Sequence, residues 1–248
     1  MKNQSQQINF FKEKGFIKLK EFYKNKEILS FEKEINKLKQ SKTNKIAKYY
    51  QSNIPKNKIS LFRIEHFYTY SGKFRKLIDS KKVNDFIFKL TKKKYILFKE
   101  KINIKPPLSR EDRLHQDVQG DWLKYSKDFI TLLISIVKTH KKNGNLIFDM
   151  SGNNKDKMKG KTFKVLKINQ LDRPKFKDMP TNRGDIFLFN GYIPHKSTKN
   201  LSNKSRDQIY ITYCLSKDKK VRKKYFAEKL NNCPPNQKNK LKNFVFKN

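Results

Sequence analysis

Three residues that lie far apart in the chain have side chains that could form a metal centre. His115 and Asp117 stand two positions apart, and on an extended strand such residues project from the same face. His195 follows a predicted strand over residues 185–189 and an Asn-Gly turn, so a hairpin return would bring it beside the first pair. Two imidazoles and one carboxylate suit non-haem Fe(II), because three coordination positions stay open for a bidentate cosubstrate and dioxygen. A closed structural zinc site would need a fourth protein ligand, and none is evident.

A serine and an arginine follow the second histidine at short spacing. Ser197 stands two positions after His195, and Arg206 stands eleven positions after it. Only eight of the 60 basic residues are arginines, and a guanidinium binds a carboxylate in a bidentate way that an ammonium cannot match. An isolated His-x-Asp is common by chance, so it is the whole set that indicates a metal site with a carboxylate-binding cation beside it.

These motifs resemble those of the phytanoyl-CoA dioxygenase family, and the resemblance spans most of the chain. Its parts are Phe10 to Leu38, Ile102-Asn103-Ile104-Lys105-Pro106-Pro107, Leu114-His115-Gln116-Asp117, Asn143-Gly144-Asn145-Leu146, the run Gly-Asp-Ile-Phe-Leu-Phe at 184–189, His195-x-Ser197, Asn200-x-Ser202 and Arg206. Two departures stand out. Residues 149–153 read Asp-Met-Ser-Gly-Asn where the family usually has a Pro-Gly-Ser-His turn, and the loop over residues 155–179 is short.

The resemblance implies a non-haem Fe(II)- and 2-oxoglutarate-dependent dioxygenase that acts as a hydroxylase, with iron bound by the two histidines and the aspartate. It also implies that Arg206 and Ser197 hold the distal carboxylate of 2-oxoglutarate and that Lys105 lines the pocket near it. The implied cofactors are Fe(II), 2-oxoglutarate as cosubstrate, and dioxygen. Oxidative decarboxylation of 2-oxoglutarate to succinate would then accompany hydroxylation of an unactivated C–H bond.

The candidate substrate residues carry weaker signals. Arg63 and Glu65 sit in an Arg-x-Glu-x-Phe pattern similar to that of bacterial members that hydroxylate small zwitterions such as 2-aminoethylphosphonate. Arg63 would then meet the anionic end and Glu65 the ammonium end. The alternative is an outward-facing cross-strand ion pair of little energetic consequence.

Three further residues are candidates for the substrate pocket. His66 reads either as a half-buried strand residue or as a pocket residue, and Gln116 lies between two candidate iron ligands. Trp122 follows the metal pair and could form a pocket wall, although large aromatics beside a buried strand are as often packing residues.

The elements expected around these motifs are mainly strands with flanking helices. Predicted helices cover residues 6–14, 24–38, 82–90 and 219–230, and predicted strands cover residues 16–20, 59–68, 95–104, 129–137, 146–150, 163–168, 185–189 and 209–215. Short strands at this spacing favour a sandwich or barrel, and the resemblance specifies a double-stranded β-helix (jelly roll, cupin-like). We expect one domain over 1–248, with a mostly helical N-terminal part (1–93), a jelly-roll core (94–216) and a C-terminal helical tail (217–248).

The composition bounds the possible partners. The formal charge of +38 and pI near 10.1 would favour an anionic partner, but the lysines are scattered as in a low-GC coding sequence rather than gathered with stacking aromatics. We therefore expect a small-molecule substrate, no specific nucleic acid and no membrane, and the oligomeric state stays open. The alternatives are a basic nucleic-acid-binding protein and a non-catalytic jelly-roll interaction module. Two cysteines and no apolar leader predict a cytoplasmic protein.

Overall fold

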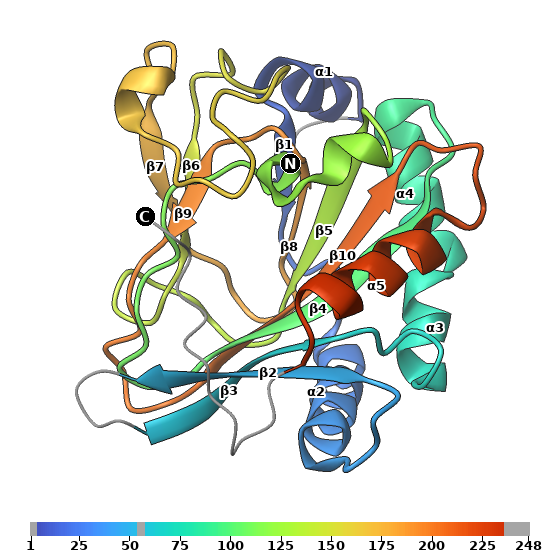
Figure 1. Ribbon diagram of the computed structural model, residues 1–248. Helices are drawn as coiled ribbons and strands as arrows, with labels where there is room; N and C mark the ends of the chain where they lie inside the picture. Colours follow the sequence, from blue (N-terminus) through green and yellow to red (C-terminus); the bar gives the residue numbers. More distant parts are fainter. Residues whose placement is uncertain (1–3, 54–57, 236–248) are drawn as a thin grey trace.

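Two antiparallel β-sheets face each other in the computed structural model, which describes residues 4–53 and 58–235 (Figure 1). The larger sheet has the order β1 (Phe16–Leu19), β8 (Ile186–Asn190), β5 (Phe129–Ser135), β10 (Arg206–Cys214), β4 (Ile96–Lys105), β3 (Lys58–Glu65), β2 (Ala47–Asn53). The smaller sheet has the order β7 (Phe176–Met179), β6 (Leu146–Asp149), β9 (His195–Ser197). Phenylalanines of both sheets pack between them, as Phe148 of β6 does against Phe187 and Phe189 of β8.

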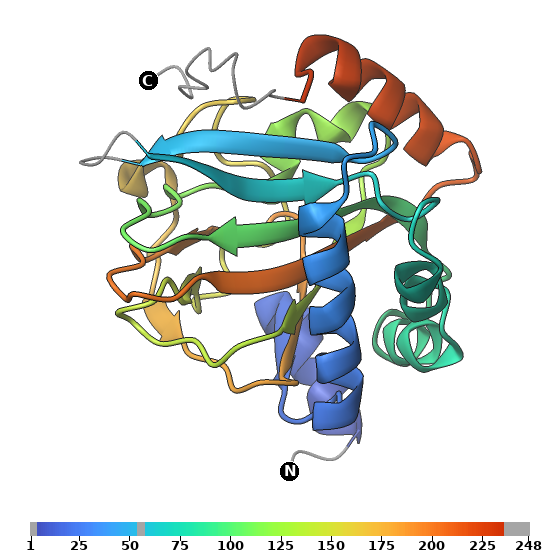
Figure 2. The same cartoon turned by 90° about the horizontal axis from the view of Figure 1, so that it is seen from below.

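Helices cover the outer face of the larger sheet (Figure 2). They are α1 (Gln4–Lys14), α2 (Asn25–Gln40), α3 (Gly72–Ile78) and α4 (Lys81–Thr91). In α2 the buried residues recur every three or four positions (Ile28, Phe31, Ile35, Leu38), which gives one apolar stripe along the helix. That stripe shares a core with the isoleucines of β4 and β10 that point outward.

The alternation along β4 and β10 explains why the part of the interior that these two strands line is polar. Ile102 and Ile104 of β4 join the core under the helices, so Lys101, Asn103 and Lys105 point toward the smaller sheet. Helix α5 (Val221–Asn232) packs beside β4 near the far end of the same face. The smaller sheet and α5 thus lie over a face of the larger sheet that carries several charged side chains.

Most predicted elements are confirmed within a few residues, but the strand predicted over residues 163–168 is wrong. That segment forms turns that lead into a 3-10 helix, η3 (Ile168–Gln170). Phe163 has a φ of 57° and is 59% exposed, so its aromatic side chain does not mark a buried strand. The short elements β2, α3 and β7 were not predicted.

The first 93 residues contribute strands as well as helices. Strands β1, β2 and β3 all belong to the larger sheet, so this part of the chain helps to build the face that carries the site. The tail contributes α5, and residues 236–248 lie outside the described part of the chain. Within the described residues, no helix is both long enough and apolar enough to cross a membrane.

Candidate metal and cosubstrate site

The structure brings the three predicted metal-binding residues together. His115, Asp117 and His195 each offer a ligand atom, and these atoms all lie within 4.8 Å of one another. The two imidazole rings have centroids 4.3 Å apart. Asp117 and His195 are buried, and His115 is partly exposed. A single ion can therefore contact all three side chains, with one edge of the site open.

Backbone pairing fixes the two histidines. The amide of His115 donates to the carbonyl of His195 at 3.0 Å, and the amide of His195 donates to the carbonyl of His115 at 2.9 Å. Nδ1 of His115 lies 2.7 Å from the carbonyl oxygen of Arg113, and Nδ1 of His195 lies 2.9 Å from that of Ile193. Such a second partner fixes the orientation of an imidazole that ligates a metal. With each Nδ1 engaged, each Nε2 is left for the ion.

Asp117 reaches the site in a different way from the one predicted. The expectation that it shares an extended strand with His115 is wrong, because Asp117 is the first residue of a 3-10 helix, η1 (Asp117–Gly120). The amide of Val118 donates to the carbonyl of Gly191, which anchors this turn to the segment before His195. The hydroxyl of Thr131 lies 3.4 Å from the Asp117 carboxylate.

The electrostatics of the three residues suit a cation. Burial, with His115 nearby, lowers the pKa of His195 to about 4, so this imidazole is neutral and can donate its lone pair. Burial alone would raise the pKa of Asp117, but the charge of Lys101 and then the two histidines lower it below its usual value. The site therefore presents a neutral imidazole at His195 and a carboxylate at Asp117.

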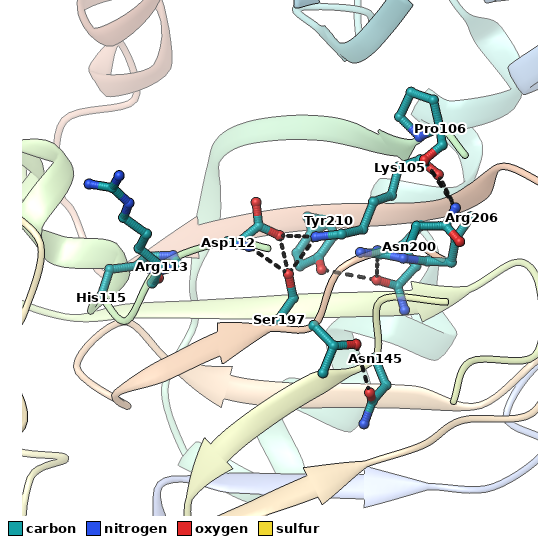
Figure 3. A network of polar contacts seen from close by, with 12 residues as sticks. Lys105, Pro106, Asp112, Arg113, His115, Asn145, Ser197, Asn200, Arg206 and Tyr210 are labelled. Atoms are coloured by element: carbon teal, nitrogen blue, oxygen red, sulfur yellow. Dashed lines mark hydrogen bonds and ion pairs between the residues drawn. The ribbon is translucent and has the colours of Figure 1, made fainter. Parts of the chain in front are cut away.

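The predicted cosubstrate residues lie beside this group. Ser197 follows His195 on β9, and Arg206 pairs in register with Lys105 across β10 and β4. The Lys105 ammonium donates to the Ser197 hydroxyl at 2.6 Å (Figure 3). Arg206 is 2% exposed and donates to Gln208, yet its Nε has no hydrogen-bond partner within the described residues. A buried guanidinium with an unmatched donor is a site for an anion.

A carboxylate that the sequence did not single out meets the same residues. Asp112 accepts from Lys105 at 3.1 Å and from the hydroxyl of Ser197, and its own amide donates to that hydroxyl at 3.0 Å (Figure 3). Partial burial raises the pKa of Asp112, but the Lys105 charge and the Ser197 hydrogen bond hold it well below its usual range. The side chain of Asp112 is 53% exposed, against 6% for Lys105. In sequence, Asp112 lies in a charged run, which is more often a solvated surface.

Close packing holds Lys105 in place from two sides. Gly144 has a φ of 91°, and a Cβ there would lie 2.5 Å from Cδ of Lys105, so only glycine lets the lysine pass. The Asn200 side chain donates to the carbonyls of Lys105 and Pro106 at 2.8 and 3.1 Å. Both residues belong to motifs recognised in the sequence, and both act by fixing the end of β4.

Among the predicted substrate residues, Arg63 and Glu65 point inward. The expectation of an outward-facing cross-strand pair is wrong, because Glu65 is 0% exposed. Ile64 faces the helices, so its two neighbours on β3 face the interior. Glu65 forms an ion pair with Lys229 of α5, and Arg63 lies 3.5 Å from Glu65 on the same strand.

The other three substrate candidates have structural partners. His66 lies just beyond β3 with a φ of 61°, and its ring packs on Phe226 with centroids 4.4 Å apart. Trp122 is 3% exposed and packs against Phe98 and Phe129. These contacts favour a packing role for Trp122 and place His66 against α5.

The Gln116 carboxamide is fully used in holding a loop. Its nitrogen donates to the carbonyls of Asn154 and Lys157 at 3.1 and 3.0 Å, and also to that of Tyr192. Its oxygen accepts from the amide of Lys159 at 2.7 Å. Gln116 therefore ties residues 154–159 to the segment that carries the metal ligands.

Comparison with known proteins agrees with this geometry. A sequence profile of the phytanoyl-CoA dioxygenase (PhyH) family matches residues 11–207. The 2-aminoethylphosphonate dioxygenase of uncultured bacterium HF130_AEPn_1 is 28% identical over 232 residues, 91% of this chain and 87% of its own length. The methylphosphonate hydroxylase of Gimesia maris is 24% identical over 223 residues, 90% of this chain and 85% of its own length.

Solved structures show the same fold. EctD from S. alaskensis, with 2-oxoglutarate and 5-hydroxyectoine, superposes with a TM-score of 0.70 at 16% identity, covering 85% of this chain and 75% of its own. The carbocyclase SnoK from nogalamycin biosynthesis gives a TM-score of 0.69 at 13% identity, covering 86% and 83%. The fold is the double-stranded β-helix, or jelly roll, with flanking helices, as the sequence predicts.

The fold and the family define a class of enzyme: a non-haem Fe(II)- and 2-oxoglutarate-dependent dioxygenase. The chain belongs to the phytanoyl-CoA dioxygenase family. This membership, with all three candidate metal ligands present, favours the enzyme over a non-catalytic jelly roll.

Proposed function

We propose that His115, Asp117 and His195 hold the iron. The observation that supports this assignment is the convergence of two free Nε2 atoms and one carboxylate within 4.8 Å, with both Nδ1 atoms tied to backbone carbonyls. This donor set fits ferrous iron, which accepts two imidazoles and a carboxylate and keeps open positions. Among the described residues no other group of three or more histidines, cysteines or carboxylates has this geometry.

We propose that Arg206, Ser197 and Lys105 bind the distal carboxylate of 2-oxoglutarate. The unmatched Nε of Arg206 and the Lys105–Ser197 hydrogen bond supply donors for it. The carboxylate of Asp112 already accepts from two of these donors, so it has to move aside or share them when the cosubstrate binds. Its half-exposed side chain leaves it free to do so.

When bound, iron and 2-oxoglutarate supply the oxidising chemistry, in which dioxygen and 2-oxoglutarate give succinate, carbon dioxide and a hydroxylated substrate. The protein's own backbone and aromatic residues hold the proposed iron ligands in place. His115 and His195 are fixed by the reciprocal backbone pair, and Asp117 by its 3-10 turn. Phe148 and Phe189, packed on the His195 ring with centroids 5.5 and 5.3 Å away, exclude water from that side.

The proposed substrate is a small phosphonate. Two relatives that align with about nine-tenths of this chain act on 2-aminoethylphosphonate and methylphosphonate, and buried cations line the interior near the metal group. A phosphonate is a compact anion that such cations would hold with its carbon toward the iron.

The test is turnover with 2-oxoglutarate, ferrous iron and either phosphonate, followed by 31P NMR and by succinate release. We expect a new phosphorus resonance and one succinate for each hydroxylated product, with neither in the His195→Ala variant. Succinate release no greater than that without phosphonate, with no new resonance, would remove phosphonates as substrates.

Two expectations from composition remain predictions. We infer a cytoplasmic location, since both cysteines are unpaired thiols, as is usual in a reducing compartment. We also infer that the excess of lysine binds no specific nucleic acid. A gel shift that persists at moderate salt would contradict the second inference.

A further inference from the structure

A second set of cations lies on the inner face of β3 and β4, beyond the cosubstrate residues. Lys101 stands four residues before Lys105 on the same face of β4, and it pairs in register with Glu65 of β3 and Tyr210 of β10. Arg63 pairs in register with Asn103 in the next row. These side chains form a layer that continues the polar face toward α5.

The carboxylate of Glu65 in this layer is already neutralised. Glu65 is completely buried, forms an ion pair with Lys229 and lies 3.5 Å from Arg63. Burial alone would raise the pKa of Glu65, but Lys229, Lys99 and Arg63 hold it far below its usual value. A carboxylate shared by three cations is a buried counter-ion, and it has little capacity left for a ligand's ammonium group.

Lys101, by contrast, forms no ion pair with a carboxylate within the described residues. Its ammonium lies 4.8 Å from the centroid of the Tyr210 ring, and within the described residues it donates no hydrogen bond. Its charge ranks ahead of both histidines among the cations that lower the pKa of Asp117, which places it next to the metal group. Burial lowers the pKa of Lys101 to about 8, against the opposing effect of the Asp117 carboxylate.

Two more polar atoms of the layer lack partners. Nε of Arg63 and Oδ1 of Asn103 are buried and have no hydrogen-bond partner within the described residues. A buried polar group that stays unpaired costs about 1–3 kcal/mol, and a ligand or water commonly satisfies it. The two residues are neighbours across β3 and β4. Nε of Arg63 is a donor that an anion can use, whereas Oδ1 of Asn103 is an acceptor that needs a donor such as water.

The charges of the layer do not balance. Its cationic side chains face Glu65 and, beside the layer, the candidate metal ligand Asp117; they are Arg63, Lys99, Lys101 and Lys229. The remaining carboxylates of β4 and α5 are engaged elsewhere, Glu100 with Arg222 and Glu228 with Lys124. Residues 1–3, 54–57 and 236–248 contain no aspartate or glutamate. The layer therefore has surplus positive charge that an anion would neutralise.

We propose that Lys101 and Arg63 form the subsite for the substrate's phosphonate group, with Glu65 as their buried counter-ion. The inference rests on the proposed function and goes beyond it in one respect: the enzyme recognises the phosphonate anion and does not recognise an ammonium group. The earlier hypothesis that Glu65 meets the amine of 2-aminoethylphosphonate is thereby replaced.

The test is equilibrium binding to the anaerobic enzyme loaded with Fe(II) and 2-oxoglutarate, measured by calorimetry. We expect Lys101→Met to weaken methylphosphonate binding about tenfold to a hundredfold, the range for a lost hydrogen bond to a charged group. Arg63→Gln should act in the same direction. Lys177→Met removes an exposed strand lysine of the smaller sheet and should leave binding unchanged.

A matched pair of ligands tests the second half of the proposal. Propylphosphonate replaces the ammonium group of 2-aminoethylphosphonate by a methyl group, and we expect 2-aminoethylphosphonate to bind no more tightly. Tenfold tighter binding of the amine, lost in Glu65→Gln, would overturn the proposal. Wild-type affinity in both Lys101→Met and Arg63→Gln would also overturn it.

The visible charge-transfer band of the iron–2-oxoglutarate chelate distinguishes a wrong subsite from a wrong substrate class. A variant that retains the band is folded and loaded, so its phosphonate affinity reports on the subsite alone. If the wild-type enzyme forms the band but binds no phosphonate, the substrate class in the proposed function is wrong as well. If the wild type binds phosphonate and neither variant loses affinity, only the subsite is wrong.

Discussion

Two lysines on one face of β4 differ in how the protein uses them. Lys105 donates to Ser197 and to Asp112, whereas Lys101, four residues earlier, contacts the ring of Tyr210 and has no carboxylate partner among the described residues. The first lysine belongs to the proposed cosubstrate site and the second to the proposed phosphonate subsite. In the proposed cosubstrate site, the carboxylate of Asp112 already accepts from Lys105. In the proposed phosphonate subsite, the ammonium group of Lys101 stays available to a ligand.

The two carboxylates near these lysines, Asp112 and Glu65, differ in how exposed their side chains are. The Asp112 side chain is 53% exposed and lies in a segment without regular structure. Glu65 is 0% exposed and lies on a strand between Arg63 and the helix that carries Lys229. Asp112 can therefore leave when a ligand arrives, while Glu65 is part of the fold.

The largest effect expected from this comparison concerns stability. Glu65→Gln leaves buried cations without a counter-ion and should lower the free energy of unfolding by about 3–5 kcal/mol, the usual result of breaking a buried pair from one side. Asp112→Asn, at a half-exposed pair, should cost less than about 1 kcal/mol. Urea unfolding of both variants measures the difference, and equal losses would contradict the distinction.

The pH dependence of that loss has a definite sign. The pKa of Glu65 is lower in the folded protein than its usual value of 4.5, so its contribution is fully present above about pH 4.5 and decreases as the pH falls toward the folded value. The gap in unfolding free energy between wild type and Glu65→Gln should therefore be constant from pH 8 to pH 5 and narrow below. A gap that widened on acidification would show that Glu65 is not held as the anion.

The next effect concerns the cosubstrate alone. Arg206→Met removes a buried guanidinium and should weaken 2-oxoglutarate binding about a hundredfold, with partial recovery in Arg206→Lys. At saturating 2-oxoglutarate, its affinity for methylphosphonate should stay within about threefold of wild type, since separate sites contribute independently. Lys101→Met should weaken methylphosphonate binding and leave 2-oxoglutarate binding nearly unchanged. A variant that weakened the binding of both ligands equally would contradict the assignment of two separate sites.

The smallest effect concerns the residue that occupies the cosubstrate donors. Asp112→Ala frees Lys105 and Ser197, so 2-oxoglutarate no longer competes with an internal carboxylate. An ion pair with one half-exposed partner contributes about 1 kcal/mol, which corresponds to binding of 2-oxoglutarate that is up to about fivefold tighter. Weaker binding in this variant would indicate that Asp112 positions the donors instead of occupying them.

The sequence points to the candidate metal and cosubstrate residues because their types are rare in this chain. Four histidines and eight arginines stand out against the lysine excess, and His195, Ser197 and Arg206 stand at informative spacing. Lys101 did not stand out, being one lysine among many. The available signal was the alternation of Lys101, Asn103 and Lys105 with Ile102 and Ile104, which indicates a polar face inside the protein.

Other features depend on contacts that spacing does not reveal. Asp112 reads as part of a charged surface run, and only the pairing of its segment with β9 brings it to Ser197. The strand predicted around Phe163 failed because an apolar residue can also lie on an exposed turn. The inward orientation of Glu65 follows from the helices that cover the other face of β3. The charge of Glu65 alone favours an exposed position, and it carries no information about these helices.

The most direct test of the central claim is anaerobic titration of the apoenzyme with Fe(II) and 2-oxoglutarate, followed by visible absorption. We expect a weak charge-transfer band that saturates at one iron per chain. The band should be absent in His195→Ala and Asp117→Ala, and in Arg206→Met it should need far more 2-oxoglutarate. A wild-type protein that forms no band, or variants at His195 and Asp117 that form it unchanged, would contradict the assignment of the iron site.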